Sequence, residues 1–156
     1  RSRSLSVSVV LVHPEIPHNT GAVGRTCVAL DLELVLIRPY GFELSDKHLK
    51  RAGLDYWQHV RLTEYDSWDA FLAERAPRED QLFLFEEYGA RRFDGPDYPD
   101  DTYLVFGCET KGLPAAIAEP LAHRMVRLPM RSTHIRSLNL SNTVAVAAYE
   151  ALRGKF

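Results

Sequence analysis

The chain of 156 residues is poor in cysteine and has no long apolar run. Its two cysteines, Cys27 and Cys108, are far apart and form no C-x-x-C pair, which argues against a disulfide scaffold and favours a reduced, cytoplasmic protein. No apolar run approaches the roughly 18 residues of a membrane-spanning helix. The N-terminal sequence lacks the apolar core of a secretory signal, so we expect neither export nor membrane insertion.

The signatures of several enzyme classes are missing as well. The sequence has no G-x-G-x-x-G and no G-x-x-x-x-G-K-[ST], which argues against Rossmann-type dinucleotide binding and against a P-loop. It has no H-E-x-x-H, no His/Cys cluster with metal-ligand spacing and no G-x-S-x-G nucleophile elbow. None of these metalloenzyme or hydrolase classes is therefore favoured.

The composition that remains is that of an ordinary globular protein, with 46% hydrophobic and 26% charged residues. The length fits one domain over residues 1–156. The net charge of −2 is unevenly spread: residues 64–101 hold four basic and twelve acidic residues, whereas residues 120–156 hold six basic and one acidic residue. This pattern is equally consistent with a C-terminal region that binds an anion and with a solvated surface whose charge is balanced by the acidic middle of the chain.

Short apolar runs alternate with helical patterns along the chain, which predicts an α/β fold with a mainly parallel sheet flanked by helices. The expected strands are residues 6–12, 34–37, 81–85, 103–106 and 125–128. The expected helices are residues 20–32, 46–52, 66–75, 113–121 and 141–153.

Polar residues at the helix starts are the expected N-caps. These are Asn19 or Thr20 for the first helix, Asp66 for the third, and Asn139 or Ser141 for the last. The last helix carries no charge over residues 143–149, so it should be covered on more than one side. Either its own core or a partner subunit would provide that cover.

Three polar stretches each follow a predicted strand, at the edge where parallel sheets bind ligands. They are N-T-G-A-V-G-R at 19–25, F-G-C-E-T-K-G-L at 106–113, and L-P-M at 128–130 continued by S-L-N-L-S-N at 137–142. The first sets Arg25 near a helix start, where it can meet phosphate or a hydroxyl, and the second lets the backbone approach a ligand at Gly107. Taken singly, each stretch also has a purely structural explanation: a surface ion pair for the first, a tight turn for the second and a helix cap for the third.

Together, in this order and spacing, these stretches resemble the three motifs of the SPOUT superfamily of S-adenosylmethionine-dependent RNA methyltransferases, in its 2′-O-ribose branch. Residues 12–21 (VHPEIPHNTG) and 46–57 (DKHLKRAGLDYW) are similar to the subfamily that methylates the wobble nucleotide of tRNA. The resemblance covers nearly the whole chain.

The resemblance implies a C-terminal deep trefoil knot, a homodimer, and S-adenosylmethionine as the cofactor. It implies cofactor binding by Phe85, Gly107, Leu128 and Ser137. It also implies a catalytic group of four residues, in which Arg25 of one subunit reaches the site of the other and activates the ribose hydroxyl: Arg25, Asn19, Glu109 and Asn139.

The substrate implied by the resemblance is cytidine or uridine 34 in the anticodon stem-loop of leucine tRNAs. Another RNA such as ribosomal RNA, or a non-catalytic RNA-binding dimer, is an alternative. Tyr56 and Trp57 are either base-stacking groups or core residues. Candidate phosphate contacts are the arginines between 124 and 136 together with Arg1, Arg3, Lys47, Lys50 and Arg51.

Overall fold

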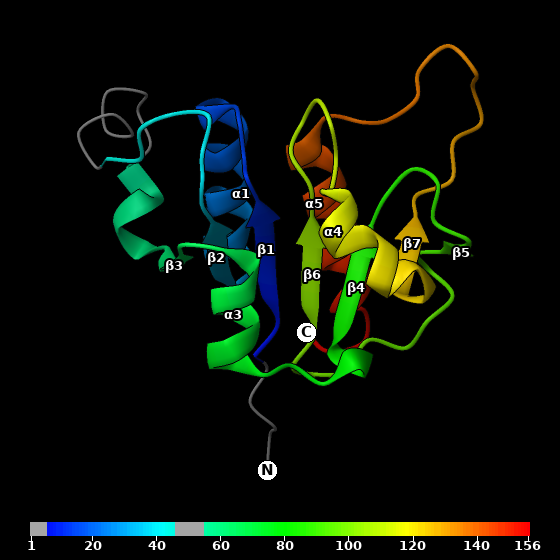
Figure 1. Cartoon of the computed structure of the whole chain (residues 1–156), viewed down its shortest axis with the longest axis horizontal. Coiled ribbons are helices and arrows are strands. Elements are labelled where there is room, and N and C mark those ends of the chain that lie inside the picture. Colours follow the sequence, from blue (N-terminus) through cyan, green and yellow to red (C-terminus); the bar gives the residue numbers. More distant parts are fainter. Residues whose placement is uncertain (1–5, 46–54) are drawn as a thin grey trace.

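A seven-stranded sheet in the order β3-β2-β1-β6-β4-β7-β5 forms the centre of the molecule (Figure 1), in a computed structural model that describes residues 6–45 and 55–156. Every neighbouring pair of strands is parallel. The strands are β1 Ser8–Val12, β2 Glu33–Ile37, β3 Arg61–Tyr65, β4 Leu82–Phe85, β5 Arg91–Arg92, β6 Tyr103–Phe106 and β7 Met125–Arg127.

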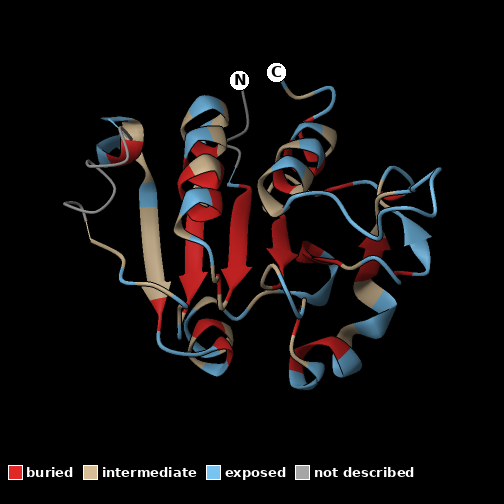
Figure 2. Ribbon diagram, turned by 90° about the horizontal axis from the view of Figure 1, so that it is seen from above, coloured by how far each residue is buried: buried red, intermediate tan, exposed pale blue. Residues whose placement is uncertain are grey.

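Helices cover both faces of this sheet (Figure 2). Helices α1 (Pro17–Leu30) and α5 (Leu140–Ala151) lie on one face, and α3 (Trp68–Arg75) and α4 (Ala115–Ala118) lie on the other. Three 3-10 turns complete the regular structure, namely η1 Asp55–His59, η2 Glu79–Gln81 and η3 Glu119–Arg124. The predicted α/β fold with a parallel sheet and flanking helices is therefore confirmed.

The central strands are apolar after their first residues because both of their faces are buried. Ser8 and Glu33, the first residues of β1 and β2, are the polar exceptions. In β1, Val9 and Leu11 pack into the cluster beneath α1 and α5, whereas Val10 and Val12 pack into the cluster beneath α3. The same alternation continues in β2, β4 and β6. This two-sided burial holds the carboxyl ends of neighbouring strands in fixed register, and the loops that follow them meet at one edge of the sheet.

Two helix N-caps differ from the sequence-based expectation. Helix α1 begins at Pro17, because proline suits a first helical position, and its N-cap Ile16 makes no side-chain hydrogen bond. Asn19 therefore lies inside the first turn, and the predicted cap at Asn19 or Thr20 is wrong. Helix α3 is capped by Ser67, whose hydroxyl accepts a hydrogen bond from the Ala70 N–H at 3.0 Å, so the predicted Asp66 cap is wrong as well.

Two strands escaped the sequence analysis. β3 (R-L-T-E-Y) lies at the edge of the sheet and is only partly covered, so it lacks the apolar run of the central strands. β5 has only two residues, both exposed. The expected helix at 46–52 lies outside the described residues, as do the candidate phosphate contacts Arg1, Arg3, Lys47, Lys50 and Arg51.

The last helix is covered on one side within a single chain. Its buried residues are Val144, Ala147, Ala148 and Ala151, whereas Val146 is 41% and Tyr149 is 55% exposed. The predicted cap at Asn139 is confirmed, because its side chain accepts a hydrogen bond from the Ser141 N–H at 2.9 Å. No helix within residues 6–45 and 55–156 is both long and apolar enough to cross a membrane.

Candidate active site

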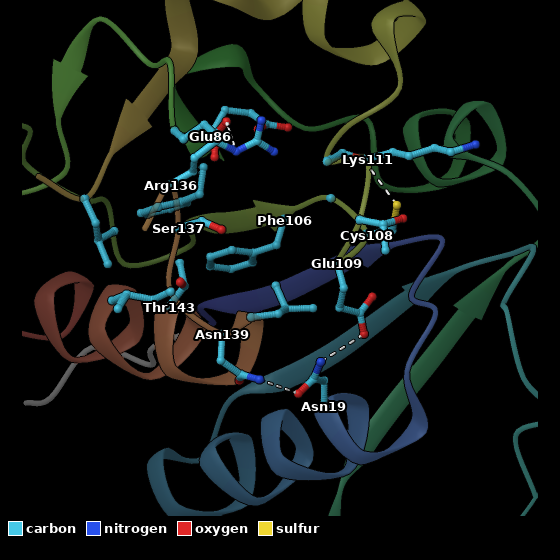
Figure 3. Close-up of a pocket in the computed structure, with 18 of the residues that line it drawn as sticks. Asn19, Glu86, Phe106, Cys108, Glu109, Lys111, Arg136, Ser137, Asn139 and Thr143 are labelled. Atoms are coloured by element: carbon cyan, nitrogen blue, oxygen red, sulfur yellow. Dashed lines mark hydrogen bonds and ion pairs between the residues drawn. The ribbon is translucent and has the colours of Figure 1, made fainter. Parts of the chain in front are cut away.

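A cavity of about 480 Å³ opens at the carboxyl ends of β4 and β6 (Figure 3). Its walls come from the last residues of these strands, from the loop at 107–112 and from the stretch at 136–143. It lies at the edge of the sheet where parallel α/β folds bind their ligands. Most of the residues singled out from the sequence line it, namely Asn19, Phe85, Gly107, Glu109, Leu128, Ser137 and Asn139.

Glu109 anchors the start of helix α1 to the loop after β6. One carboxylate oxygen accepts a hydrogen bond from the Glu15 N–H at 2.9 Å, and the other accepts from the Ile16 N–H at 2.9 Å and from the Asn19 side-chain amide at 3.2 Å. Backbone N–H groups at a helix start have no partner inside the helix and carry the positive end of its dipole. Glu109 thus performs the capping that no side chain at the helix start provides.

Asn19 joins this carboxylate to the last helix. Its side-chain carbonyl accepts a hydrogen bond from the Asn139 amide at 3.0 Å, and the Asn139 carbonyl in turn accepts from the Ser141 N–H that opens α5. Glu109, Asn19 and Asn139 therefore form one connected network, shown by the dashed lines in Figure 3. The network brings the first polar stretch to the other two, since Glu109 lies 90 and Asn139 lies 120 residues further along the chain than Asn19.

A reciprocal contact fixes the same loop from the other side. The Glu15 carboxylate accepts hydrogen bonds from the Thr110 N–H at 2.9 Å and from the Thr110 hydroxyl at 2.8 Å. These bonds from Thr110 lower the pKa of Glu15. The loop and the helix start thus each supply a carboxylate to backbone N–H groups of the other.

Two glycines let the backbone of this loop fold against the cavity. A Cβ at Gly107 would lie 2.1 Å from the carbonyl carbon of Gly112, so a larger residue has no room there. Gly112 has φ +69° and lies against Glu86, whose carboxylate oxygen would be 2.6 Å from a Cβ at this position. Cys108, between the two glycines, is half-buried, whereas Cys27 is fully buried and burial raises its pKa to about 12.

The floor of the cavity is apolar. Phe85 and Phe106, the last residues of β4 and β6, stack with ring centroids 4.8 Å apart and planes 19° from parallel. Both rings belong to the buried core, and both line the cavity. Such an apolar floor can hold the apolar face of a ligand, while the polar groups around it supply hydrogen bonds.

Arg25 is the one expected site residue that does not line the cavity. It is exposed on α1, and its guanidinium lies 5.4 Å from the ring centroid of Tyr56. The Tyr56 hydroxyl donates to the Gly21 carbonyl at 2.9 Å. Trp57 is 7% exposed and packs against Gly24, so of the two explanations for this residue the core one is confirmed.

The sequence analysis assigned no role to several polar residues of the cavity wall, among them Glu86, Glu87, Lys111 and Thr143. Glu86 and Glu87 directly follow a predicted strand, and Lys111 and Thr143 lie within or beside the polar stretches, so only their positions could have indicated them. Arg136, an expected phosphate contact, also lines the wall. In the part of the chain that the structure describes, no group of three or more His, Cys, Asp or Glu side chains could hold a metal ion.

Two known proteins resemble this chain over most of its length. A tRNA (cytidine(34)-2′-O)-methyltransferase of Burkholderia cenocepacia (strain HI2424) is 47% identical over 147 residues, which cover 94% of each chain. A solved structure described as work on the 2-OH methylation of C/U34 on tRNA superposes with a TM-score of 0.87 at 45% identity, covering 97% of this chain and 92% of the other.

A more distant match is a SpoU methyltransferase of Streptomyces viridochromogenes, solved in complex with the cofactor AdoMet. It has a TM-score of 0.83 at 25% identity, and the match covers 99% of this chain and 60% of that one. The sequence profile of the SpoU rRNA Methylase family matches residues 6–149. The chain described here therefore belongs to the SpoU rRNA Methylase family.

Proposed function

We propose that this protein transfers a methyl group from S-adenosylmethionine to the ribose 2′-hydroxyl of nucleotide 34, cytidine or uridine, in tRNA. We take the whole chain, residues 1–156, as one methyltransferase domain. The observation that carries the proposal is the Glu109–Asn19–Asn139 network, which joins the three motif stretches around one cavity. The activity named for the Burkholderia relative supports the choice of reaction and nucleotide.

The cavity fits the proposed cofactor. Phe85 and Phe106 give it an apolar floor against which an adenine ring can lie, and Gly107 lets the loop after β6 fold tightly against the Gly112 backbone beside that floor. Leu128 and Ser137 complete the wall on the C-terminal side. When bound, S-adenosylmethionine supplies a methyl group already activated by its sulfonium, so the reaction requires no metal.

The residues of this chain then have separate tasks. A ribose hydroxyl is a poor nucleophile and must lose its proton as it attacks. An arginine has a pKa above about 12 and stays protonated, so we assign Arg25 to hydrogen bonding and positioning of the hydroxyl, with a neighbouring RNA phosphate to relay the proton. Glu109, Asn19 and Asn139 hold the loop and the two helices in place around the site.

We further propose a homodimer in which Arg25 of one subunit reaches the cavity of the other. The exposed position of Arg25 outside its own cavity supports this arrangement. The exposed apolar side chains near and on α5 support it too, because they leave an uncovered apolar surface next to the cavity: Ile135, Leu138, Val146 and Tyr149.

We also propose the trefoil knot for the C-terminal part of the fold. β7 lies beyond β4 in the sheet, whereas the following helix α5 packs back on α1 and β6. Residues 128–139 must therefore recross the end of β4, past the loops that bound the cavity. An experimental chain trace that straightens without a knot when drawn out from both ends would contradict this topology.

The substrate we propose is the anticodon stem-loop of leucine tRNAs, and the compartment is the cytoplasm. The two free cysteines agree with a reducing compartment. Methylation of another RNA, such as ribosomal RNA, is the second candidate, because the SpoU rRNA Methylase family takes its name from that substrate.

The decisive experiment uses methyl-labelled S-adenosylmethionine and tRNA from cells that lack this enzyme, followed by nuclease digestion and mass mapping. We expect a 2′-O-methyl group on nucleotide 34 of leucine tRNAs. Label in ribosomal RNA alone would shift the assignment to the second candidate. Binding of RNA without methyl transfer would indicate a non-catalytic dimer.

Arg25→Ala tests the assigned role, with Arg61→Ala as the matched control. Arg61 is also exposed, but it binds the Asp31 carbonyl at the far edge of the sheet. We expect Arg25→Ala to abolish methyl transfer while cofactor binding and folding are retained, and Arg61→Ala to keep its activity. Normal turnover by Arg25→Ala, or a fully active monomer, would refute the shared site.

A further inference from the structure

Glu86 is a carboxylate in the cavity wall that none of the proposed roles uses. It follows Phe85 at the end of β4 and is half-buried. Figure 3 shows it at the opposite end of the cavity from Asn19 and Asn139, with the Phe106 ring between them. The cavity thus has a second polar end, separate from the network around Glu109.

The Glu86 carboxylate is only partly satisfied within the protein. One oxygen accepts a hydrogen bond from the Leu113 N–H at 2.6 Å. Burial raises the pKa of Glu86, the hydrogen bonds from the Leu113 and Glu87 backbones oppose that rise, and the neighbouring Glu87 charge adds to it. Among the residues in 6–45 and 55–156, no cation forms an ion pair with Glu86, and the nearby Arg136 pairs with Glu87 instead, at 3.9 Å.

A purely structural role does not account for a carboxylate at this point. The Leu113 N–H needs a single acceptor, whereas an ionised carboxylate offers about four acceptor sites on two oxygens. Removing such a group from water carries a free-energy cost unless its sites are filled. The fold also makes room for it, since Gly112 has no side chain where a Cβ would meet the carboxylate oxygen at 2.6 Å.

We propose that Glu86 is a cofactor-binding residue whose carboxylate accepts hydrogen bonds from the ribose hydroxyls of the S-adenosyl group. This inference rests on the proposed function of the cavity. The apolar floor made by Phe85 and Phe106 suits the adenine ring, and Glu86 is the next residue after Phe85. A ribose places two hydroxyl donors beside its base, and a carboxylate that follows a strand binds the ribose of dinucleotides in the same manner.

Calorimetric titration with S-adenosylhomocysteine tests the proposal without any turnover. Glu86→Gln keeps a carbonyl oxygen for the Leu113 N–H but removes the charge and half of the acceptors. We expect this variant to bind about tenfold more weakly or worse, because a hydrogen bond to a charged group is lost. Glu87→Gln is the matched control: it removes the adjacent charge from the same wall and should change the affinity less than about twofold.

Ligands that lack one hydroxyl identify the partner of Glu86. We expect the loss caused by Glu86→Gln to shrink for the 2′-deoxy or 3′-deoxy analogue of S-adenosylhomocysteine, because the variant and the analogue remove the same bond. An undiminished loss with both analogues would overturn the proposal and would point to the ligand amino group. Glu86→Asp, which retains the charge, provides a second variant should Glu86→Gln fail to fold.

Binding of S-adenosylhomocysteine to the wild-type protein and to Glu86→Gln distinguishes a wrong function for the cavity from a wrong role for Glu86. If the wild-type protein binds no S-adenosylhomocysteine, the proposed function of the cavity is wrong. If the wild-type protein binds it and Glu86→Gln binds equally well, only the role of Glu86 is wrong. Thermal unfolding of each variant, measured without ligand, separates both outcomes from a loss of structure.

Discussion

Two polar clusters lie at opposite ends of the same sheet, and they are built differently. The cavity network consists of Asn19, Glu109 and Asn139 at the carboxyl ends of the strands. The cluster at the amino ends, here called the edge cluster, is centred on Glu33 at the start of β2 and contains four residues: Ser8, Glu33, Thr63 and Arg75.

The edge cluster satisfies its own carboxylate. Glu33 accepts hydrogen bonds from Ser8 at 2.9 Å, from Thr63 at 2.7 Å, and from both terminal nitrogens of Arg75 at 2.9 and 2.7 Å. Burial alone would raise the pKa of Glu33, but the bonds from Arg75, Thr63 and Ser8 outweigh it and lower the pKa to about 2. Neither Glu33 nor Arg75 lines the cavity.

The cavity network is held by neutral donors instead. Backbone N–H groups and side-chain amides hold Glu109, and the network borders open space that a ligand can fill. The comparison indicates that a closed, charge-balanced cluster serves stability, whereas a cluster held by the backbone at the edge of a cavity serves binding. Changes in the edge cluster should therefore alter stability most, and changes at the cavity should alter binding.

Arg75→Met is expected to lower the free energy of unfolding by about 3 kcal/mol, because it leaves a largely buried carboxylate without its cation. Affinity for S-adenosylhomocysteine should stay at the wild-type value. Urea unfolding and calorimetry measure the two quantities. Arg78→Met is the control, since Arg78 pairs with Asp80 and Asp101 on the exposed surface and its loss should cost less than about 1 kcal/mol. Equal costs for the two variants would contradict the division.

Acid should destabilise the folded protein because it protonates Glu33. Its pKa is about 2 in the folded chain and about 4.3 in an unfolded one, so its stabilisation is complete above about pH 5 and is lost as the pH falls towards 2. The expected contribution at neutral pH is about 3 kcal/mol. Between pH 7 and pH 3, the free energy of unfolding should fall less steeply for Glu33→Gln than for the wild type. Parallel profiles would show that the edge cluster does not govern acid stability.

Gly107→Ala should damage the cavity more than the fold. The added methyl would meet the Gly112 backbone at 2.1 Å, so the loop must shift, at a cost of about 2 kcal/mol in stability. Binding of S-adenosylhomocysteine should fall at least tenfold. Gly95→Ala is the control, because its methyl would have a nearest neighbour at 3.4 Å. Wild-type affinity in Gly107→Ala would disprove the close approach of this loop to the ligand.

Loss of a helix cap should have the smallest effect on stability, and two caps can be compared. Asn139→Ala and Ser67→Ala each remove a cap and should each cost about 1 kcal/mol. Only Asn139→Ala also removes a bond to Asn19, so only this variant should lose methyl transfer, by about tenfold or more. Equal activity of the two variants would show that Asn139 has no role in methyl transfer.

The apolar runs of the central strands and the spacing of the polar stretches were readable from the sequence, because burial on both faces forces a continuous apolar pattern. The half-covered strand at Arg61–Tyr65 was not readable, since its partners lie on one side only. The cap of α1 was misjudged for a related reason: the carboxylate that caps it, Glu109, lies 93 residues away from Ile16.

The sequence alone determined the α/β class and the order of the motif stretches, because these depend on local pattern and on the rule that strand ends meet at one edge. Most of the site residues implied by the resemblance to a methyltransferase family also line the cavity. Only the tertiary structure decided what those residues contact. It joined Asn19 to Glu109 and Asn139, left Arg25 outside its own cavity, and set Glu86 against Gly112. Side-chain partners depend on distances between segments far apart in the chain, and a linear pattern does not contain those distances.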